Sequence, residues 1–173
     1  MSVSISRMGG VVSHQNKKIV KAFQRPSVLQ DIKIIGEDMR QSDIEELQAQ
    51  SGGKPKESLL FCFFASTPCM TIVSRHGNPI GMWGVVPQGD IYGRIWMLGC
   101  DAMLQDSSDK RTFLKESKIE LKKLHNKYPV LGNIVDARNS VHIRWLHWMG
   151  FTFINKLSDW GPESRPFYEF VRI

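Results

Sequence analysis

The residues best suited to chemistry lie in one short segment, VDARNSVHIRWLHWMGF, which runs from residue 135 to residue 151. Asp136, Arg138 and Asn139 follow a strand-like run of apolar residues and can form a polar site at the end of that strand. A structural alternative is an ion pair between Asp136 and either Arg138 or Arg144, with Asn139 capping the helix that follows. The residues alone leave both interpretations open.

The helix expected after Asn139 carries two histidines, His142 and His147, whose structural interpretation is as polar groups on the side of the helix. Of the two tryptophans on this helix, Trp145 is expected on the core side, while Trp148 lies off that line and suits a protein contact.

The elements that must position these residues follow from apolar periodicity and turn signals. They predict five helices, over 29–39, 42–50, 55–65, 106–127 and 140–149, the third of them apolar almost all round and therefore buried. β-rich runs predict six strands, over 69–74, 80–86, 94–99, 131–137, 151–154 and 167–173. Helices followed by strands and two further helices predict an α/β or α+β sandwich, with a mixed central sheet flanked by helices.

Length and composition fit one domain without a membrane span. The chain has 173 residues, of which 42% are hydrophobic and 23% are charged. No apolar run reaches the roughly 18 residues that a membrane-spanning helix needs, and the N-terminus has no secretory h-region. The three cysteines, Cys62, Cys69 and Cys100, match no zinc-binding spacing and are interpreted as core residues, so no metal site is expected.

The net charge of +6 is concentrated at the N-terminus. Residues 1–26 contain five basic residues and no acid, while residues 27–173 contain 18 bases and 17 acids and are nearly neutral. This contrast predicts a basic N-terminal arm over 1–26 and a folded domain over 27–173. The arm is expected to dock on partner protein subunits, with non-specific nucleic-acid binding as a further possibility. The predicted partner-binding residues are Lys17, Lys18, Ile19, Lys21, Phe23 and Arg25.

Four residues of the 135–151 segment carry a resemblance to a known superfamily. Asn139, Ile143, Gly150 and Phe151 have the types and spacing of the second cofactor motif of the GNAT acyltransferases, which this chain resembles. The resemblance implies a GNAT-like fold.

A closer resemblance, over about residues 28–173, is to the internal virion protein A family of short-tailed bacteriophages. It is carried by MWGV at 82–85, LG at 98–99, YP at 128–129, VDARN at 135–139, IRWL at 143–146, GF at 150–151, and WGPE at 160–163 with PF at 166–167. This resemblance implies a phage protein involved in virion assembly.

The GNAT resemblance also implies acetyl-CoA, whose diphosphate is held by backbone N–H groups at a helix N-terminus. The corresponding segment here is CDAMLQDSSDKR at 100–111, which has no glycine and carries three aspartates. If acetyl-CoA binds, the resemblance assigns it to Leu98, Ser108, Lys110, Arg111 and Asn139. The family's proton-donating tyrosine falls on Leu146, which leaves His142 as a substitute.

The sequence therefore supports two functions. The first is a non-catalytic phage virion structural or assembly protein without a cofactor. It is expected to form homo-oligomers within an assembly and to bind other virion proteins, but to bind no membrane. Its expected location is the virion, or the host cytoplasm during assembly. The alternative is an active GNAT-type N-acetyltransferase with an atypical acetyl-CoA site.

Overall fold

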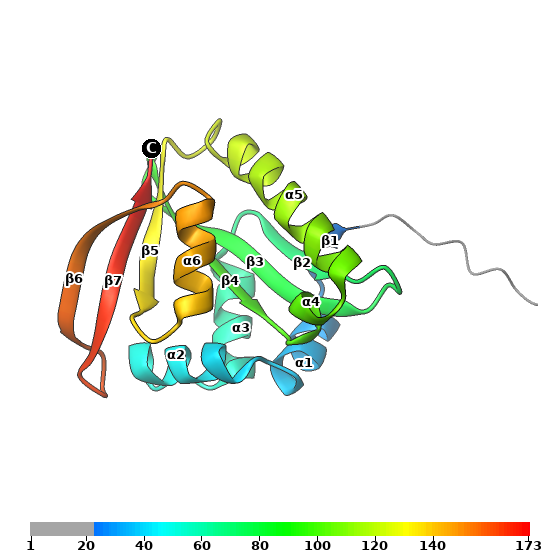
Figure 1. The fold of residues 1–173 in the computed structure, drawn as a ribbon, viewed down its shortest axis with the longest axis horizontal. Coiled ribbons are helices and arrows are strands. Elements are labelled where there is room, and N and C mark those ends of the chain that lie inside the picture. Colours follow the sequence, from blue (N-terminus) through cyan, green and yellow to red (C-terminus); the bar gives the residue numbers. More distant parts are fainter. Residues whose placement is uncertain (1–22) are drawn as a thin grey trace, which may run out of the picture.

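A seven-stranded sheet organises residues 23–173, the part of the chain that the computed structural model describes (Figure 1). The strands are β1 (Gln24–Pro26), β2 (Cys69–Val73), β3 (Pro79–Gln88), β4 (Tyr92–Gly99), β5 (Val130–Asp136), β6 (Thr152–Trp160) and β7 (Arg165–Arg172). Their spatial order is β1-β2-β3-β4-β5-β7-β6. Neighbouring strands are antiparallel except β4 and β5, which run parallel. The predicted mixed sheet is thus confirmed.

Helices cover both faces of this sheet. They are α1 (Leu29–Glu37), α2 (Gln41–Ser51), α3 (Pro55–Ala65), α4 (Ala102–Gln105), α5 (Ser107–Leu124) and α6 (Ser140–Trp148). Figure 1 shows α5 and α6 on the near face, α3 on the far face, and α2 across the lower edge beneath β5 and α6. None of the helices in the described part of the chain is long and apolar enough to cross a bilayer.

Alternating side chains of β3 divide the interior into two apolar cores. Met82 packs with Ile35 of α1 and Leu59 of α3 on one face of the sheet. Trp83 points to the other face and packs with Phe113 of α5. Because successive strand residues point to opposite faces, a strand buried on both sides lacks the apolar-polar alternation of a surface strand.

The folded domain begins before the boundary predicted at residue 27. Gln24 pairs with Ile72 as part of β1, and the ring of Phe23 lies 6.3 Å from that of Phe113. Phe23 and Arg25, which were assigned to a partner-binding arm, therefore belong to the folded domain. The other predicted arm contacts, at 17, 18, 19 and 21, lie outside the described residues.

One buried carboxylate holds β1 against the sheet. Asp31 of α1 accepts two hydrogen bonds of 2.7 Å from the Arg25 guanidinium, one of 2.7 Å from the Thr71 hydroxyl and one of 2.9 Å from the Val28 N–H. Burial opposes ionisation, but these donors outweigh it and leave the pKa of Asp31 below its usual value.

Three further elements differ from the predictions. The helix α3 is not buried all round, because it packs on the sheet through Leu59 and leaves Phe61 and Phe64 each 72% exposed. The short helix α4 was missed, since four residues give no periodicity. The strand β6 continues to Trp160 instead of ending at residue 154, because an edge strand exposed to solvent tolerates the polar residues that indicated a loop.

We expect Asp31→Ala to lower the free energy of unfolding by about 2 kcal/mol at neutral pH, because it leaves Arg25 and Thr71 without their acceptor. Since the folded pKa is depressed, this stabilisation is present above the ordinary carboxyl range and is lost as the pH falls through the folded pKa. Urea denaturation at several pH values measures the effect. Lys33→Ala, an exposed change on the same helix, is the control, and equal losses in both variants would contradict this account.

Candidate functional site

The parallel strands β4 and β5 pair over only three residues and then diverge. Backbone pairing extends from Tyr92 to Arg94 on β4 and from Val130 to Gly132 on β5. At the next position the side chain of Asn133 donates a hydrogen bond of 2.9 Å to the carbonyl of Ile95. Beyond this point the edge of β4 does not pair with β5, so the sheet opens towards the lower edge where α2 lies.

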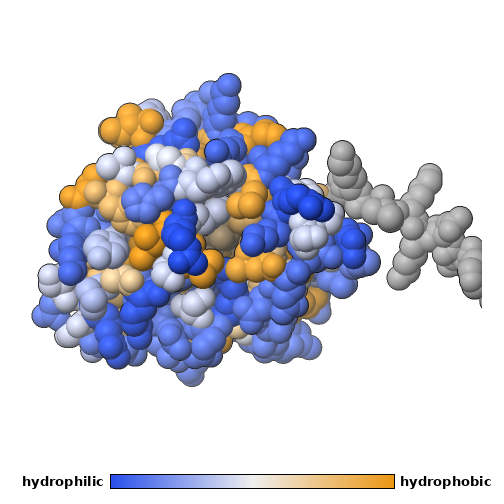
Figure 2. All heavy atoms as spheres, viewed as in Figure 1, coloured by the Kyte–Doolittle hydropathy of each residue, from blue (hydrophilic) through white to orange (hydrophobic). Residues whose placement is uncertain are grey.

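The opening between the strands contains a cavity of about 530 Å³. Its walls are mainly apolar and come from both faces of the sheet, including Cys62 of α3, Trp96 of β4, Leu121 of α5 and Trp145 of α6. Figure 2 shows the near face hollowed close to its middle, with apolar residues around the hollow. The cavity therefore provides a mainly apolar space that crosses the plane of the sheet.

The helix α2 is fixed across the open end of the cavity by a buried ion pair. Arg40 and Asp43 are joined at 2.8 Å, and Asp43 also accepts a hydrogen bond of 2.9 Å from the N–H of Gly99 at the end of β4. The N–H of Arg40 donates to the carbonyl of Gly99 at 2.9 Å. Glu46 follows Asp43 by three residues, so these bonds also fix its place on the cavity wall.

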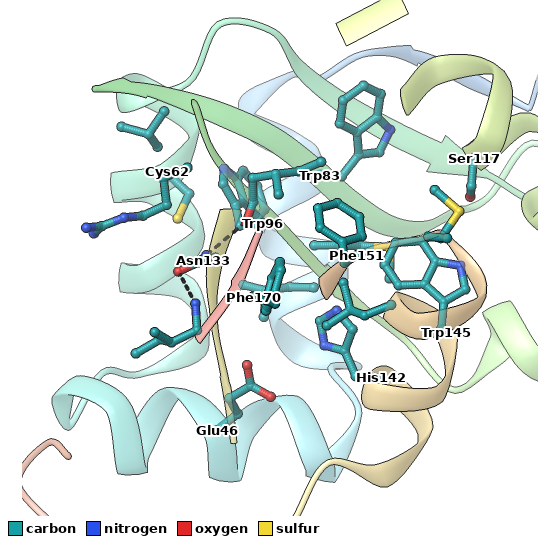
Figure 3. Close-up of a pocket in the computed structure, with 18 of the residues that line it drawn as sticks. Glu46, Cys62, Trp83, Trp96, Ser117, Asn133, His142, Trp145, Phe151 and Phe170 are labelled. Atoms are coloured by element: carbon teal, nitrogen blue, oxygen red, sulfur yellow. Dashed lines mark hydrogen bonds between the residues drawn. The ribbon is translucent and has the colours of Figure 1, made fainter. Parts of the chain in front are cut away.

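Glu46 is a partly buried acid that points from α2 into the cavity (Figure 3). Its Oε2 accepts a hydrogen bond of 2.8 Å from Nδ2 of Asn139. Burial raises the pKa of Glu46 to about 8, with the charges of Asp43 and Asp136 adding to the rise and the Asn139 hydrogen bond opposing it. A carboxyl with that pKa can exchange a proton near neutral pH, which suits a general base.

His142 lies on the same cavity, on the first turns of α6 (Figure 3). Burial, together with the positive charge of Arg40, lowers the pKa of His142 to about 3. The ring is therefore neutral at pH 7 and carries one N–H that can donate a hydrogen bond. It packs beside Trp145, with 5.6 Å between ring centroids.

The polar residues at the end of β5 have structural partners. Arg138 binds Asp136 at 2.6 Å, and Oδ1 of Asn139 accepts a hydrogen bond of 3.3 Å from the N–H of His142. The ion pair and the helix cap anticipated as the structural alternative are both present, with Arg138 rather than Arg144 as the partner. Asn139 also holds Glu46, a role that the sequence did not suggest.

The residues predicted to bind a cofactor do not lie together, and Asn139 is at the N-cap of α6. Leu98 lines the cavity, whereas Ser108, Lys110 and Arg111 form the first turns of α5. There the N–H groups of Ser108 and Asp109 donate to the carboxylate of Asp106, at 2.8 and 3.0 Å. At the N-terminus of α5, the carboxylate of Asp106 thus occupies the position where an external anion would bind.

Sequence reasoning missed Glu46. The helix α2 has many polar residues, and an acid on such a helix is typical of a face exposed to solvent. In addition, its hydrogen-bond partner Asn139 lies 93 residues away in the sequence. The apolar residues Ile44 and Leu47, which lie close to Glu46 in the sequence, gave no sign that Glu46 faces a cavity. Among the described residues, no group of three side chains is arranged to hold a metal ion.

We expect the pH dependence of stability to report the protonation of Glu46. Its folded pKa of about 8 exceeds its unfolded value of 4.5, so the folded state keeps a proton that the unfolded chain loses between these values. Stability from this group is therefore greatest at low pH and falls as the pH rises through that window.

Relative to Glu46→Gln, the wild-type protein should lose stability between about pH 5 and pH 8, by on the order of a few kcal/mol. Denaturant titrations across this range measure the difference. Glu45→Gln, on the exposed side of α2, is the control. Parallel stability curves for wild type and Glu46→Gln would contradict the raised pKa.

No protein-family model and no curated protein sequence matches the chain. Solved structures do match. A GNAT-family acetyltransferase from Bacillus anthracis is 11% identical, with a TM-score of 0.63 over 87% of this chain and 93% of that one. A ribosomal-protein-alanine N-acetyltransferase from Brucella melitensis is 16% identical, with a TM-score of 0.63 over 88% of this chain and 99% of that one.

A spermidine N-acetyltransferase from Vibrio cholerae, solved in complex with CoA and spermine, is 11% identical, with a TM-score of 0.64 over 86% of this chain and 93% of that one. At these identities the likeness concerns the fold. The resemblance to the phage family stays a prediction. The described part of this chain has the fold of the GNAT acetyltransferases.

Proposed function

We propose that this protein transfers an acyl group from a thioester to an amine in the cavity between β4 and β5. The observation that carries the proposal is Glu46, a carboxyl with a pKa of about 8 that faces a mainly apolar cavity. Support also comes from the fold, because the similar structures described above are named as acetyltransferases. The same function is the alternative that the sequence supports.

Glu46 acts as the general base in this reaction. The amine nitrogen attacks the thioester carbonyl carbon, the carbon–sulfur bond breaks, and the amide forms. A proton passes from the amine to the Glu46 carboxylate and then to the departing thiolate, which leaves as a thiol. A base with a pKa near the working pH is well matched to such a transfer.

His142 has a different role from the acid suggested by the sequence. With a pKa of about 3, it holds no second proton to give at neutral pH. Its neutral ring can donate one hydrogen bond to the thioester carbonyl oxygen, where negative charge develops during the attack. Leu146, at the position of the family's tyrosine, is 2% exposed and has no proton to donate.

Acetyl-CoA, the donor that the fold implies, fits this protein only in part. The apolar cavity suits the acyl and thioester groups, but the N–H groups that would hold a diphosphate at the start of α5 already bind Asp106. The residues present therefore do not form a diphosphate site.

We expect Glu46→Gln to lower the acyl-transfer rate by about 100-fold, because glutamine cannot accept the amine proton. The assay follows thiol release from S-acetyl-N-acetylcysteamine with n-butylamine as the acceptor. Expressed per concentration of free amine, the wild-type rate should rise with pH through a midpoint near pH 8 and level off above it, following the ionisation of Glu46. Glu45→Gln should keep the wild-type rate. A fully active Glu46→Gln variant would exclude Glu46 as the base.

A second candidate is a non-catalytic assembly protein, and specifically a phage virion protein that binds other virion proteins and copies of itself. Two observations favour it: Leu146 replaces a proton donor, and Asp106 closes the end of α5. The excess of positive charge among residues 1–26 is suited to contact with an acidic partner surface.

Deletion of residues 1–22 tests the second candidate. The truncated chain keeps Phe23 and β1, so we expect a melting temperature close to that of the full chain. Under this candidate, sedimentation velocity should show that the full chain forms oligomers and that the truncated chain does not. Equal oligomeric states in both chains, with acyl transfer retained, would remove the support for an assembly role of these residues.

A further inference from the structure

We propose that the acyl donor is a thioester whose thiol carries no nucleotide diphosphate, such as an acyl ester of a pantetheine arm. This inference rests on the proposed acyl transfer in the cavity between β4 and β5. The observation behind it is that the Asp106 carboxylate binds the N–H groups at the N-terminus of α5, where an external anion would otherwise bind.

Asp106 uses the free N–H groups at the start of α5. Its Oδ1 accepts from the N–H of Ser108 and of Asp109, and its carbonyl accepts from the N–H of Lys110 at 2.9 Å. The first N–H groups of a helix are those that otherwise bind an external phosphate. A diphosphate would therefore have to displace a covalently attached carboxylate from its own helix.

The loop between β2 and β3 completes this arrangement with a cation. The guanidinium of Arg75 lies 3.0 Å from Oδ2 of Asp106, and the N–H of Arg75 donates to Oδ1 of Asp109 at 3.0 Å. The N–H of Asp109, together with that of Ser108 and the charge of Arg75, holds the pKa of Asp106 below its usual value. Asp106 therefore stays charged at neutral pH, and its charge is already balanced.

The segment leading to Asp106 is anchored in the core. Figure 1 shows α4 between the end of β4 and the start of α5, and its Met103 is 1% exposed. The Met103 sulfur lies against the backbone of Gly81 and Gly99, where a Cβ on either glycine would collide with it. This packing holds the backbone of the segment in place, so that Asp106 is positioned to cap α5.

The remaining charges at this end of α5 do not favour a diphosphate. Lys110 and Arg111 are exposed, and the same short segment carries three carboxylates, at Asp101, Asp106 and Asp109. The cavity, in contrast, remains open and apolar, with Glu46 and His142 both on its wall. The site thus keeps the features needed for an uncharged thioester and lacks those needed for a nucleotide.

Calorimetry on the full chain compares acetyl-CoA with S-acetylpantetheine. In the wild-type protein the two dissociation constants should agree within about threefold, because the N–H groups of Ser108 and Asp109 are already bound to Asp106. Asp106→Gly removes the competing carboxylate and leaves a residue that helix N-caps tolerate. This variant should bind acetyl-CoA at least about tenfold more tightly and bind S-acetylpantetheine unchanged. Asp101→Ala removes a nearby charge that caps no N–H group, so it should strengthen acetyl-CoA binding by less than about threefold and leave S-acetylpantetheine binding unchanged.

The outcomes separate this inference from the proposed function. Wild-type protein that binds acetyl-CoA more than about tenfold more tightly than S-acetylpantetheine would overturn the inference and leave acyl transfer standing. Failure to bind either thioester would overturn the proposed function and the inference with it. A third measurement uses an acetylated carrier protein that bears a pantetheine group. If the carrier protein binds more tightly than S-acetylpantetheine, the donor comes from a carrier protein. If it binds more weakly, the donor is a small thioester.

Discussion

The hydrogen bond from the Asn133 side chain to the Ile95 carbonyl marks the place where the central sheet stops being continuous. Up to that point β4 and β5 satisfy each other through backbone pairing, and beyond it they do not. A side-chain amide resembles a peptide group in its donors and acceptors, so Asn133 can end the pairing without leaving the Ile95 carbonyl unsatisfied. The cavity, and the helix that closes its open end, depend on this separation.

The apolar cavity favours the uncharged forms of both Glu46 and His142. Loss of water disfavours the charged form of any group, so it raises the pKa of Glu46 and lowers that of His142. Both groups are mainly uncharged at pH 7, so the part of the cavity wall that they form carries little charge. Such a space selects for a neutral amine and a neutral thioester over ammonium or phosphate groups.

Local features of this protein could be predicted from its sequence, and the site could not. The Asn139 cap, the Asp136–Arg138 pair and the left-handed Gly150 with φ of 82° all involve neighbours within a few residues, so residue types sufficed. The strand β1 has three residues and pairs with a strand more than 40 positions later, which no periodicity can reveal. The cavity arises where strands fail to pair, and Glu46 acquires its properties from distant segments that bury it.

The Asn139 side chain serves two elements at once. Its oxygen caps α6 and its nitrogen holds Glu46, so one amide in one orientation satisfies both. Replacing it would remove a helix cap and release a buried carboxyl together, and a change at Glu46 would leave an amide nitrogen without its acceptor. Substitutions at these two positions should therefore be non-additive. In evolutionary terms, the two residues form an epistatic pair that is expected to change together or to stay.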